Sequence, residues 1–277
     1  MDRSIGIIGL GFVGGALLKS FNFKHITVNC YDKYKDGGIG KLSDVINTQI
    51  VFLCLPTKFN ENLNIYDKSA INIICDQLSN LCYNGAVVIK STVEPNTTEN
   101  LAKTFPKLNL IHNPEFLTAI TAFKDFHNQK HIVLGRSSTC SIDSYDEVRQ
   151  FYKNNYPDAE ISLSSSTESE CMKIFVNCFY ASKIQIFNEF YLLCDKIGSD
   201  YGCVKQMMIK NGWINPMHTD VPGIDGQLSY GGLCFPKDTN ALLQFMKTNS
   251  SKKKVLQAVV EERNEMREDD LNIIKLE

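Results

Sequence analysis

Short apolar runs alternate with amphipathic stretches along the first part of the chain. The runs are predicted strands, at residues 4–8, 26–31, 49–55, 86–90, 108–111, 132–135 and 160–163. Helical spacing of apolar residues marks 16–21, 68–82 and 143–154. A strand with no polar face needs cover on both sides, as the strands of a parallel sheet have. The alternation therefore predicts an α/β fold, a doubly wound parallel sheet, over residues 1–165.

From residue 166 the pattern is helical. Residues 167–197 hold no Pro or Gly, and apolar side chains surround much of a predicted helix of about 30 residues. The segment 167–170 (Thr-Glu-Ser-Glu) is predicted to start it as a capping box. Shorter helices are predicted at 200–211, 239–248 and 252–267, with a loop at 213–229. We therefore expect an all-helical domain over 166–277, whose long central helix joins the two domains and packs against a second copy in a homodimer.

The first strand runs into Gly9-x-Gly11-x-x-Gly14, and the second ends at Asp32. This is a dinucleotide-binding fingerprint, in which the glycines allow a tight turn, approach of a pyrophosphate and close helix–strand packing. Asp32 would bind the ribose hydroxyls and repel a 2′-phosphate, which favours NAD, while Lys33 and Lys35 keep NADP open. The sequence predicts a Rossmann-type domain whose cofactor-binding residues in this region are Gly9, Gly11, Phe12, Val13, Gly14, Asp32 and Lys33.

Polar residues follow the ends of three further predicted strands, at Thr57, Thr92 and Glu115. Ligands of doubly wound sheets bind at the carboxyl ends of the strands, so these side chains are candidates for the site. The alternative is that they are ordinary turn residues, since Pro-Thr and Ser-Thr pairs are common in loops.

A chemically distinctive stretch is 230–238, Tyr-Gly-Gly-Leu-Cys-Phe-Pro-Lys-Asp. Its glycines allow the backbone to approach a ligand, and Pro236 suits the start of a helix. Cys234 would then lie just ahead of a helix N-terminus, where the dipole and Lys237 favour a thiolate, with Asp238 as a nearby acid/base group. The alternative is a glycine turn before an ordinary helix with a buried cysteine.

Three polar residues interrupt the long helix. Lys173 and Asn177 are four residues apart and share a face, to which Asn188 returns about three turns later. Lys173 could stabilise an oxyanion, and Asn177 could donate to the same oxygen. A solvated stripe on the helix surface is the alternative.

Composition limits the classes of partner. The 277 residues include 29 Lys and Arg against 31 Asp and Glu, so no broad basic surface for nucleic acid is expected. None of the ten cysteines forms a Cys-x-x-Cys pair, and no metal site is predicted. No apolar run approaches the ~20 residues of a membrane span, and the first residues predict a strand where a signal peptide would have its apolar core. We expect a cytoplasmic protein with reduced thiols that does not bind membranes.

The ordered set of motifs resembles the UDP-glucose/GDP-mannose dehydrogenase family, most closely the UDP-glucose 6-dehydrogenases, from the first residues to about residue 265. The motifs are Gly9-x-Gly11-x-x-Gly14, Leu55-Pro56-Thr57, Lys90-Ser91-Thr92-Val93, Asn113-Pro114-Glu115-Phe116-Leu117, Glu170-x-x-Lys173-x-x-x-Asn177, Phe187-Asn188-Glu189, Val221-Pro222-Gly223 and Gly231-Gly232-x-Cys234-Phe235-Pro236-Lys237-Asp238.

The resemblance implies NAD-dependent oxidation of UDP-glucose at C6 to UDP-glucuronate, with two hydride transfers and a thiohemiacetal and thioester on Cys234. It implies that Lys173 and Asn177 stabilise the oxyanion at C6. It also implies that Asp238, with Thr92, positions a proton-accepting water, and that Glu115 serves hydrolysis of the thioester. It also implies cofactor contacts at Pro56, Thr57, Thr92 and Lys237, and substrate contacts at Phe116, Leu117, Lys173, Asn177, Asn188, Gly223, Tyr230, Gly231 and Gly232.

Three other functions stay open. The same chemistry could act on GDP-mannose or UDP-N-acetylmannosamine. The chain could be a truncated, non-catalytic module that binds nucleotides or dimerises. A plain 2-hydroxyacid or 6-phosphogluconate dehydrogenase would share the two-domain plan, but it would not need Cys234.

The sequence departs from the family pattern in three places. Ala119 stands where the family has a second Glu, so one acidic contributor to the water network is absent, and Pro95-Asn96 replaces the usual Pro-Gly. The family's carboxy-terminal nucleotide-binding domain has no counterpart in the 277 residues. We expect a compact two-domain form, a weaker hold on UDP, or a partner chain that supplies the missing surface.

Overall fold

The computed structural model describes residues 4–60, 62, 65–118 and 120–267, so the predicted departure at Ala119 lies outside the described residues. The chain forms two compact units. The first holds the chain up to Thr57 together with Asp67–Lys173, and the second holds Lys58–Tyr66 and the chain from Ile174 onward. The division at Lys173 falls inside a helix, so one element contributes to both units.

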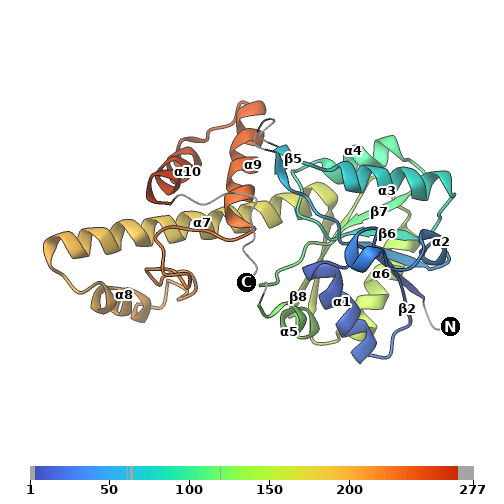
Figure 1. The fold of residues 1–277 in the computed structure, drawn as a ribbon, viewed down its shortest axis with the longest axis horizontal. Coiled ribbons are helices and arrows are strands. Elements are labelled where there is room, and N and C mark those ends of the chain that lie inside the picture. Colours follow the sequence, from blue (N-terminus) through green and yellow to red (C-terminus); the bar gives the residue numbers. More distant parts are fainter. Residues whose placement is uncertain (1–3, 61, 63–64, 119, 268–277) are drawn as a thin grey trace. The chain divides into compact units, whose positions relative to one another are not determined.

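The first unit is built on a seven-stranded sheet among the described residues, in the order β2-β1-β3-β6-β7-β8-β9 (Figure 1). Every strand predicted from the apolar runs is present. Their bounds are β1 Ile5–Ile8, β2 Val28–Tyr31, β3 Ile50–Leu53, β6 Ala86–Ile89, β7 Asn109–His112, β8 His131–Arg136 and β9 Glu160–Ser165.

The sheet is mostly parallel, as predicted, with one antiparallel pair that the alternation of strands and helices did not predict. Strands β2, β1, β3, β6 and β7 are parallel, whereas β8 pairs with β7 in the antiparallel sense and β9 is parallel to β8. The connection from β7 to β8 contains one short helix, α5 (Ala122–His127), and returns the chain in the opposite direction.

Helices cover both faces of this sheet, which confirms the doubly wound fold. Alternate residues of β3 show the division: Ile50 and Phe52 face a core that includes residues of α1 (Phe12–Phe23), α5 and α6 (Ile142–Asn155). Val51 and Leu53 face a second core with residues of α2 (Leu42–Val45), α3 (Ser69–Asn80) and α4 (Thr97–Thr104). Because both faces are buried, the central strands β3 and β6 are apolar at every position. A short 3₁₀ turn, Lys35–Gly37, follows β2.

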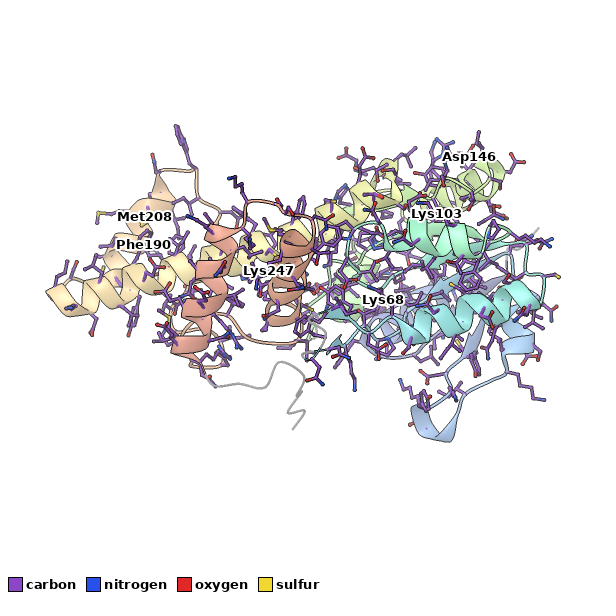
Figure 2. The ribbon with its side chains drawn as sticks, turned by 90° about the horizontal axis from the view of Figure 1, so that it is seen from above. Lys68, Lys103, Asp146, Phe190, Met208 and Lys247 are labelled. Atoms are coloured by element: carbon purple, nitrogen blue, oxygen red, sulfur yellow. The ribbon has the colours of Figure 1, made fainter. Side chains whose placement is uncertain are left out.

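The second unit is helical apart from a two-stranded hairpin, β4 (Phe59–Asn60) and β5 (Ile65–Tyr66), which the apolar pattern did not predict. Its helices are α8 (Tyr201–Lys210), α9 (Phe235–Thr248), α10 (Lys254–Met266) and the part of α7 (Ser166–Ile197) beyond Lys173. α8 packs on the far part of α7, through a cluster that includes Phe187, Tyr201 and Met208, the last labelled in Figure 2.

The start of α7 corrects the predicted capping box by two residues. The backbone N–H and hydroxyl of Ser165 donate to the carboxylate of Glu168 at 2.8 Å, and the N–H of Glu168 donates to the Ser165 hydroxyl at 3.3 Å. This reciprocal pair is a capping box at 165–168, where β9 ends and α7 begins. The predicted partner, Glu170, has a different role that is described below.

Gly14 allows α1 to lie against the turn after β1. A Cβ at Gly14 would lie 1.9 Å from the carbonyl oxygen of Gly9 and 3.2 Å from Cβ of Cys54. The neighbouring Gly15 differs, because its nearest heavy atom, the carbonyl oxygen of Leu10, would lie 3.7 Å from an added Cβ. The predicted role of Gly14 in close helix–strand packing is therefore confirmed, and Gly15 offers a matched control.

We expect Gly14→Ala to destabilise the protein by at least about 2 kcal/mol, because backbone must move to admit the methyl group. Gly15→Ala should leave the stability unchanged or raise it by up to about 1 kcal/mol, because Ala is favoured over Gly inside a helix. Chemical denaturation of both variants measures the difference. Equal stabilities of the two variants would contradict the packing argument.

Candidate active site

The glycine turn and Asp32 meet at a pocket on the first unit. The pocket has a volume of about 640 Å³ and is lined by residues that include Gly11, Phe12, Asp32 and Lys35. An added Cβ at Gly11 would meet no heavy atom within 4 Å, so this backbone is open to a close ligand. A pocket with bare backbone at a helix N-terminus and a carboxylate at the end of β2 suits a dinucleotide. The residues present therefore fit NAD.

Asp32 is fixed by backbone donors. Leu10 N–H donates to Oδ2 at 2.7 Å, and the N–H groups of Tyr34 and Lys35 donate to Oδ1 at 2.9 Å. Burial alone would raise the pKa of Asp32, but these donors outweigh it and the pKa lies below its ordinary value. The Lys35 ammonium donates to the Leu10 carbonyl at 2.7 Å, and Lys33 lies over the Tyr34 ring. Asp32 is thus held as an anion beside the turn.

The loops after β3 and β6 are tied to each other. The Thr57 hydroxyl donates to the carbonyl of Thr92 at 2.9 Å, and the Ser91 hydroxyl donates to the carbonyl of Leu55 at 2.6 Å. Thr57 is buried and Pro56 is exposed. The Thr57 hydroxyl therefore has a structural partner, and the two loops form one supported edge at the carboxyl ends of neighbouring parallel strands.

A fully buried lysine holds the loop after β7. The Lys90 ammonium donates to Oδ1 of Asn113 at 2.8 Å, and burial lowers its pKa to about 8. The carboxylate of Glu115 accepts from the N–H of Leu117 at 2.6 Å. Its other oxygen lies 3.9 Å from the ammonium of Lys173, which is 5.1 Å from the ring centroid of Phe116. The first unit thus brings together Glu115, Phe116 and Lys173, all predicted from the sequence.

Lys173 is positioned by the first turns of α7, which are bonded to the sheet domain. The carboxylate of Glu170, fully buried, accepts from both the N–H and the hydroxyl of Thr98 at 2.7 and 2.6 Å, at the N-terminus of α4. The Ser169 hydroxyl lies 2.8 Å from Nδ1 of His112 on β7. Burial raises the pKa of Glu170 to about 7, although the donors on Thr98 lower it.

The polar residues of α7 are not a solvated stripe. Lys173, Asn177 and Asn188 are 5%, 6% and 1% exposed. The side-chain amide of Asn177 donates to Oδ2 of Asp238 at 2.6 Å. Asn188 instead accepts from the N–H of Ser229 at 2.8 Å and so supports the loop ahead of the cysteine.

Asp238 is fully buried in the second unit and is surrounded by donors. Besides Asn177, the Lys237 ammonium donates to its Oδ1 at 2.5 Å, and the hydroxyl of Tyr66 donates to the same oxygen. The sequence interpretation missed Tyr66. The signal for it was a pair of aromatic residues, Phe59 and Tyr66, in a stretch rich in Asn and charged residues.

Cys234 occupies the N-cap position of α9, which confirms the predicted place ahead of a helix, and Pro236 lies in the first turn. The residue is exposed, so the alternative of a buried core cysteine was wrong. The N–H of Asp238 donates to the carbonyl of Cys234 at 3.0 Å, which closes the first turn of α9 and fixes the spacing between thiol and carboxylate.

The two glycines ahead of Cys234 serve different purposes. Gly232 has a φ of +77°, and an added Cβ there would meet no heavy atom within 4 Å. A Cβ at Gly231 would lie 2.3 Å from the guanidinium of Arg267, which donates to the carbonyl of Leu228 at 3.2 Å and pairs with Asp225. The absence of a side chain at Gly231 thus admits Arg267, which the sequence interpretation also missed.

The loop around these glycines is held by the protein itself. The buried Tyr230 has its hydroxyl 3.3 Å from that of Thr239, and its carbonyl accepts from Arg263 at 3.3 Å. Gly223 N–H donates to the carbonyl of Gln227 at 2.9 Å. These contacts give Gly223, Tyr230, Gly231 and Gly232 defined backbone positions within the second unit.

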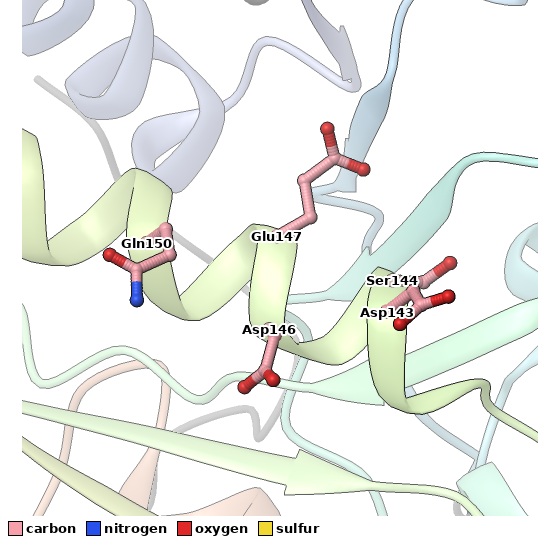
Figure 3. Close-up of a pocket in the computed structure, with 5 residues that line it drawn as sticks. All are labelled: Asp143, Ser144, Asp146, Glu147 and Gln150. Carbon is pink, nitrogen blue, oxygen red and sulfur yellow. The ribbon is translucent and has the colours of Figure 1, made fainter.

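A separate hollow lies on α6 (Figure 3). It has a volume of about 360 Å³ and is lined by Asp143, Ser144, Asp146, Glu147 and Gln150. Its carboxylates would repel an anionic nucleotide, and none of the predicted site residues lines it.

Two domain models of the UDP-glucose/GDP-mannose dehydrogenase family match this chain. The NAD binding domain matches residues 39–155, and the central domain matches residues 167–265. The chain belongs to this family. Its cofactor is NAD, in agreement with the fit of the glycine turn and Asp32. The predicted family and Rossmann-type fold class are confirmed.

Curated relatives agree with the assignment, and solved structures share the fold. The UDP-glucose 6-dehydrogenase of Rickettsia bellii is 32% identical over 226 residues, which cover 79% of this chain and 50% of that protein. A UDP-glucose dehydrogenase structure from Pyrobaculum islandicum, 23% identical, superposes with a TM-score of 0.83 over 96% of this chain and 68% of that one. A UDP-D-ManNAc dehydrogenase from Pyrococcus horikoshii, 19% identical, has a TM-score of 0.79 over 95% of this chain and 69% of that one.

The chain spans about half the length of the curated relatives it matches. Among the helices that the structure describes, none combines the length and the apolar character that crossing a bilayer would require.

We expect the contribution of Glu170 to the free energy of unfolding to fall as the pH rises from about 4.5 to about 7. Folding raises the pKa of this carboxyl from 4.5 to about 7, so stability present below pH 4.5 is lost as the pH rises to the folded value. Buried His112, whose pKa is lowered to about 3, contributes in the opposite direction, so the comparison of variants isolates Glu170. Glu170→Gln should remove up to about 3 kcal/mol of this pH dependence, measured by chemical denaturation at several pH values.

Glu168→Gln is the matched control for that experiment. The donors on Ser165 hold the pKa of Glu168 below its ordinary value, so this residue stays ionised from pH 5 to 8. Replacing it should weaken the cap of α7 equally at every pH, so the change of the free energy of unfolding with pH should stay as in the wild type. If Glu170→Gln also leaves this pH dependence unchanged, the buried carboxyl of Glu170 does not cause it.

Proposed function

We propose that this chain oxidises the C6 alcohol of UDP-glucose to the carboxylate of UDP-glucuronate, in two NAD-dependent steps. The observation that carries the proposal is the first turn of α9. It presents an exposed thiol, Cys234, and four residues later a buried carboxylate, Asp238, bound by the amide of Asn177. An alcohol dehydrogenase that stops at the aldehyde needs no such nucleophile, whereas oxidation to an acid does.

In this proposal Cys234 forms the covalent intermediates. The first oxidation takes a proton and a hydride from the C6 alcohol and leaves an aldehyde. The sulfur of Cys234 adds to the aldehyde carbon to give a thiohemiacetal, and loss of its hydroxyl proton and a second hydride gives a thioester. Water then attacks the thioester, releasing the acid and returning the thiol. NAD supplies the hydride acceptor for both oxidations.

The other residues stabilise charge and hold protons. Lys173 lies 3.9 Å from Glu115, beyond hydrogen-bonding distance, so its ammonium can turn toward an oxyanion at C6. Asn177 would donate to the same oxygen. Asp238, with Thr92, would hold the water that accepts the proton of the alcohol, and Glu115 would assist hydrolysis of the thioester. The predicted contacts of NAD with Pro56, Thr57 and Lys237, and of the sugar nucleotide with the glycine loop, belong to this proposal.

The identity of the sugar rests on fewer observations than the reaction does. The curated relatives that match are named for UDP-glucose, which favours that substrate. Solved structures of similar fold include a UDP-D-ManNAc dehydrogenase and a GDP-mannose dehydrogenase, so UDP-N-acetylmannosamine and GDP-mannose are the alternative substrates. We assign cofactor binding to residues 1–165, and the nucleophile and dimerisation to residues 166–277.

We also propose a homodimer through α7. One face of this helix carries a stripe of exposed apolar side chains, which recur at intervals of three, four or seven residues. They are Phe175, Phe179, Ile186, Phe190, Leu193 and Ile197. Such a stripe on a 32-residue helix suits packing against the same stripe of a second copy.

Turnover of the purified protein tests the reaction. We expect two NADH formed per UDP-glucose consumed, and loss of acid formation in Cys234→Ala because no thioester can form. Cys203→Ala, which removes another exposed thiol of the same unit, should retain the parental rate. Acid formation by Cys234→Ala at the parental rate would refute the proposed mechanism.

A panel of nucleotide sugars separates the alternatives. Turnover of UDP-N-acetylmannosamine or GDP-mannose in preference to UDP-glucose would change the substrate and keep the chemistry. NAD binding without turnover of any sugar would favour a non-catalytic module. Calorimetry with UDP-glucose alone asks whether a partner chain is required, because heat of binding would exclude an obligatory helper.

Two adjacent leucines test the dimer. Leu193, 56% exposed, lies on the stripe, and Leu192, 37% exposed, lies about 100° away around the helix. A charge at position 193 would be buried in the interface, so Leu193→Glu should weaken dimerisation by at least about tenfold. Leu192→Glu should not. Sedimentation measures both, and equal effects of the two variants would exclude the stripe as the interface.

A further inference from the structure

The hairpin β4–β5 belongs to the second unit, although the chain on either side of it lies in the first. Phe59 pairs with Tyr66 across the two strands, and both side chains are buried. They lie in an apolar cluster with Ile174 and Cys178 of α7 and residues of α9 and α10. Figure 1 shows β5 beside α9. The hairpin is therefore part of the core on which α9 rests.

The hydroxyl of Tyr66 reaches out of this cluster to the carboxylate of Asp238, where it donates to Oδ1. Two other donors hold the same carboxylate. Lys237 donates to Oδ1 at 2.5 Å, and Asn177 donates to Oδ2 at 2.6 Å. The Lys237 ammonium is also 4.6 Å from the centroid of the Tyr66 ring. Three separate segments thus fix both oxygens of one buried anion.

We propose that Tyr66 is a positioning residue for the reaction, which fixes the orientation of the Asp238 carboxylate. This rests on the proposed function, in which Asp238 holds the water that accepts a proton. A hydrogen bond to a carboxylate is stronger than one between neutral groups, so the Tyr66 hydroxyl is an effective partner for its oxygen. The pairing of Tyr66 with Phe59 and the burial of its ring hold this donor in place.

The charged and titratable groups around Asp238 decide what loss of the hydroxyl would do. Lys237 faces it from α9, and Tyr66 faces it from β5. On α7, the thiol of Cys178 donates to the backbone carbonyl of Asp238 at 3.5 Å. Burial, and then the charge of Asp238, raise the pKa of Cys178, so this group is a neutral thiol. With Lys237 and Asn177 still in place, removal of the Tyr66 hydroxyl should loosen the orientation of the Asp238 carboxylate and leave two of its donors intact.

The test is Tyr66→Phe, which keeps the buried ring and removes only the hydroxyl. We expect kcat with UDP-glucose to fall about tenfold, with the KM for NAD unchanged within about twofold. A purely structural role would lower stability without separating the effect on kcat from the effect on KM in this way.

Tyr201→Phe is the matched control in the same unit. Its hydroxyl donates to the carbonyl of Thr219 at 2.6 Å and is likewise in a buried residue. This variant loses a hydrogen bond of similar length without touching Asp238. The proposal predicts the parental kcat in Tyr201→Phe. A parental kcat in Tyr66→Phe, or an equal fall of kcat in both variants, overturns it.

A second measurement does not depend on turnover. In a double-mutant cycle with Asp238→Asn, Tyr66→Phe should change the unfolding equilibrium constant at least about fivefold less than it does in the wild type, because the charged acceptor is already gone. If no nucleotide sugar is turned over, the proposed function fails, and this coupling still supports the action of Tyr66 on Asp238. Additive effects in the cycle would overturn it.

Discussion

The structure depends on how the first turns of α7 are held. The carboxylate of Glu170 takes two donors from Thr98 at the N-terminus of α4, and Ser169 contacts His112 on β7. These bonds attach the helix to the sheet domain just before Lys173. The attachment places the Lys173 ammonium 3.9 Å from Glu115 and over the ring of Phe116, all within the first unit. The cost is a buried carboxyl whose pKa is raised to about 7 by desolvation.

Much of the sheet domain could be predicted because its strands and turns depend on residues that are close together in the sequence. A strand covered on both faces is apolar at every position, and each predicted strand appears within a few residues of its expected bounds. The spacing of the glycines in the fingerprint predicts a tight turn and close packing of the helix, and Gly14 packs as predicted. Cys234 was likewise placed ahead of a helix by Pro236, whose ring is suited to a first turn.

The errors have a common origin in contacts distant along the chain. Thr167–Glu170 has the spacing of a capping box, but Ser165 and Glu168 form it, because β9 continues to Ser165. Glu170 is then available to Thr98, 72 residues away. The reversal of β8 depends on the short α5, which carries too weak a pattern to predict. Tyr66 contacts Asp238 across 172 residues, and no local pattern encodes such a pairing.

The guanidinium of Arg267 fills the place that a side chain at position 231 would occupy. The loop ahead of Cys234 and the residue that follows α10 are therefore complementary in shape. A larger residue at position 231 would fit only if the side chain at position 267 were smaller or displaced. The absence of a side chain at Gly231 is thus explained by packing inside the second unit.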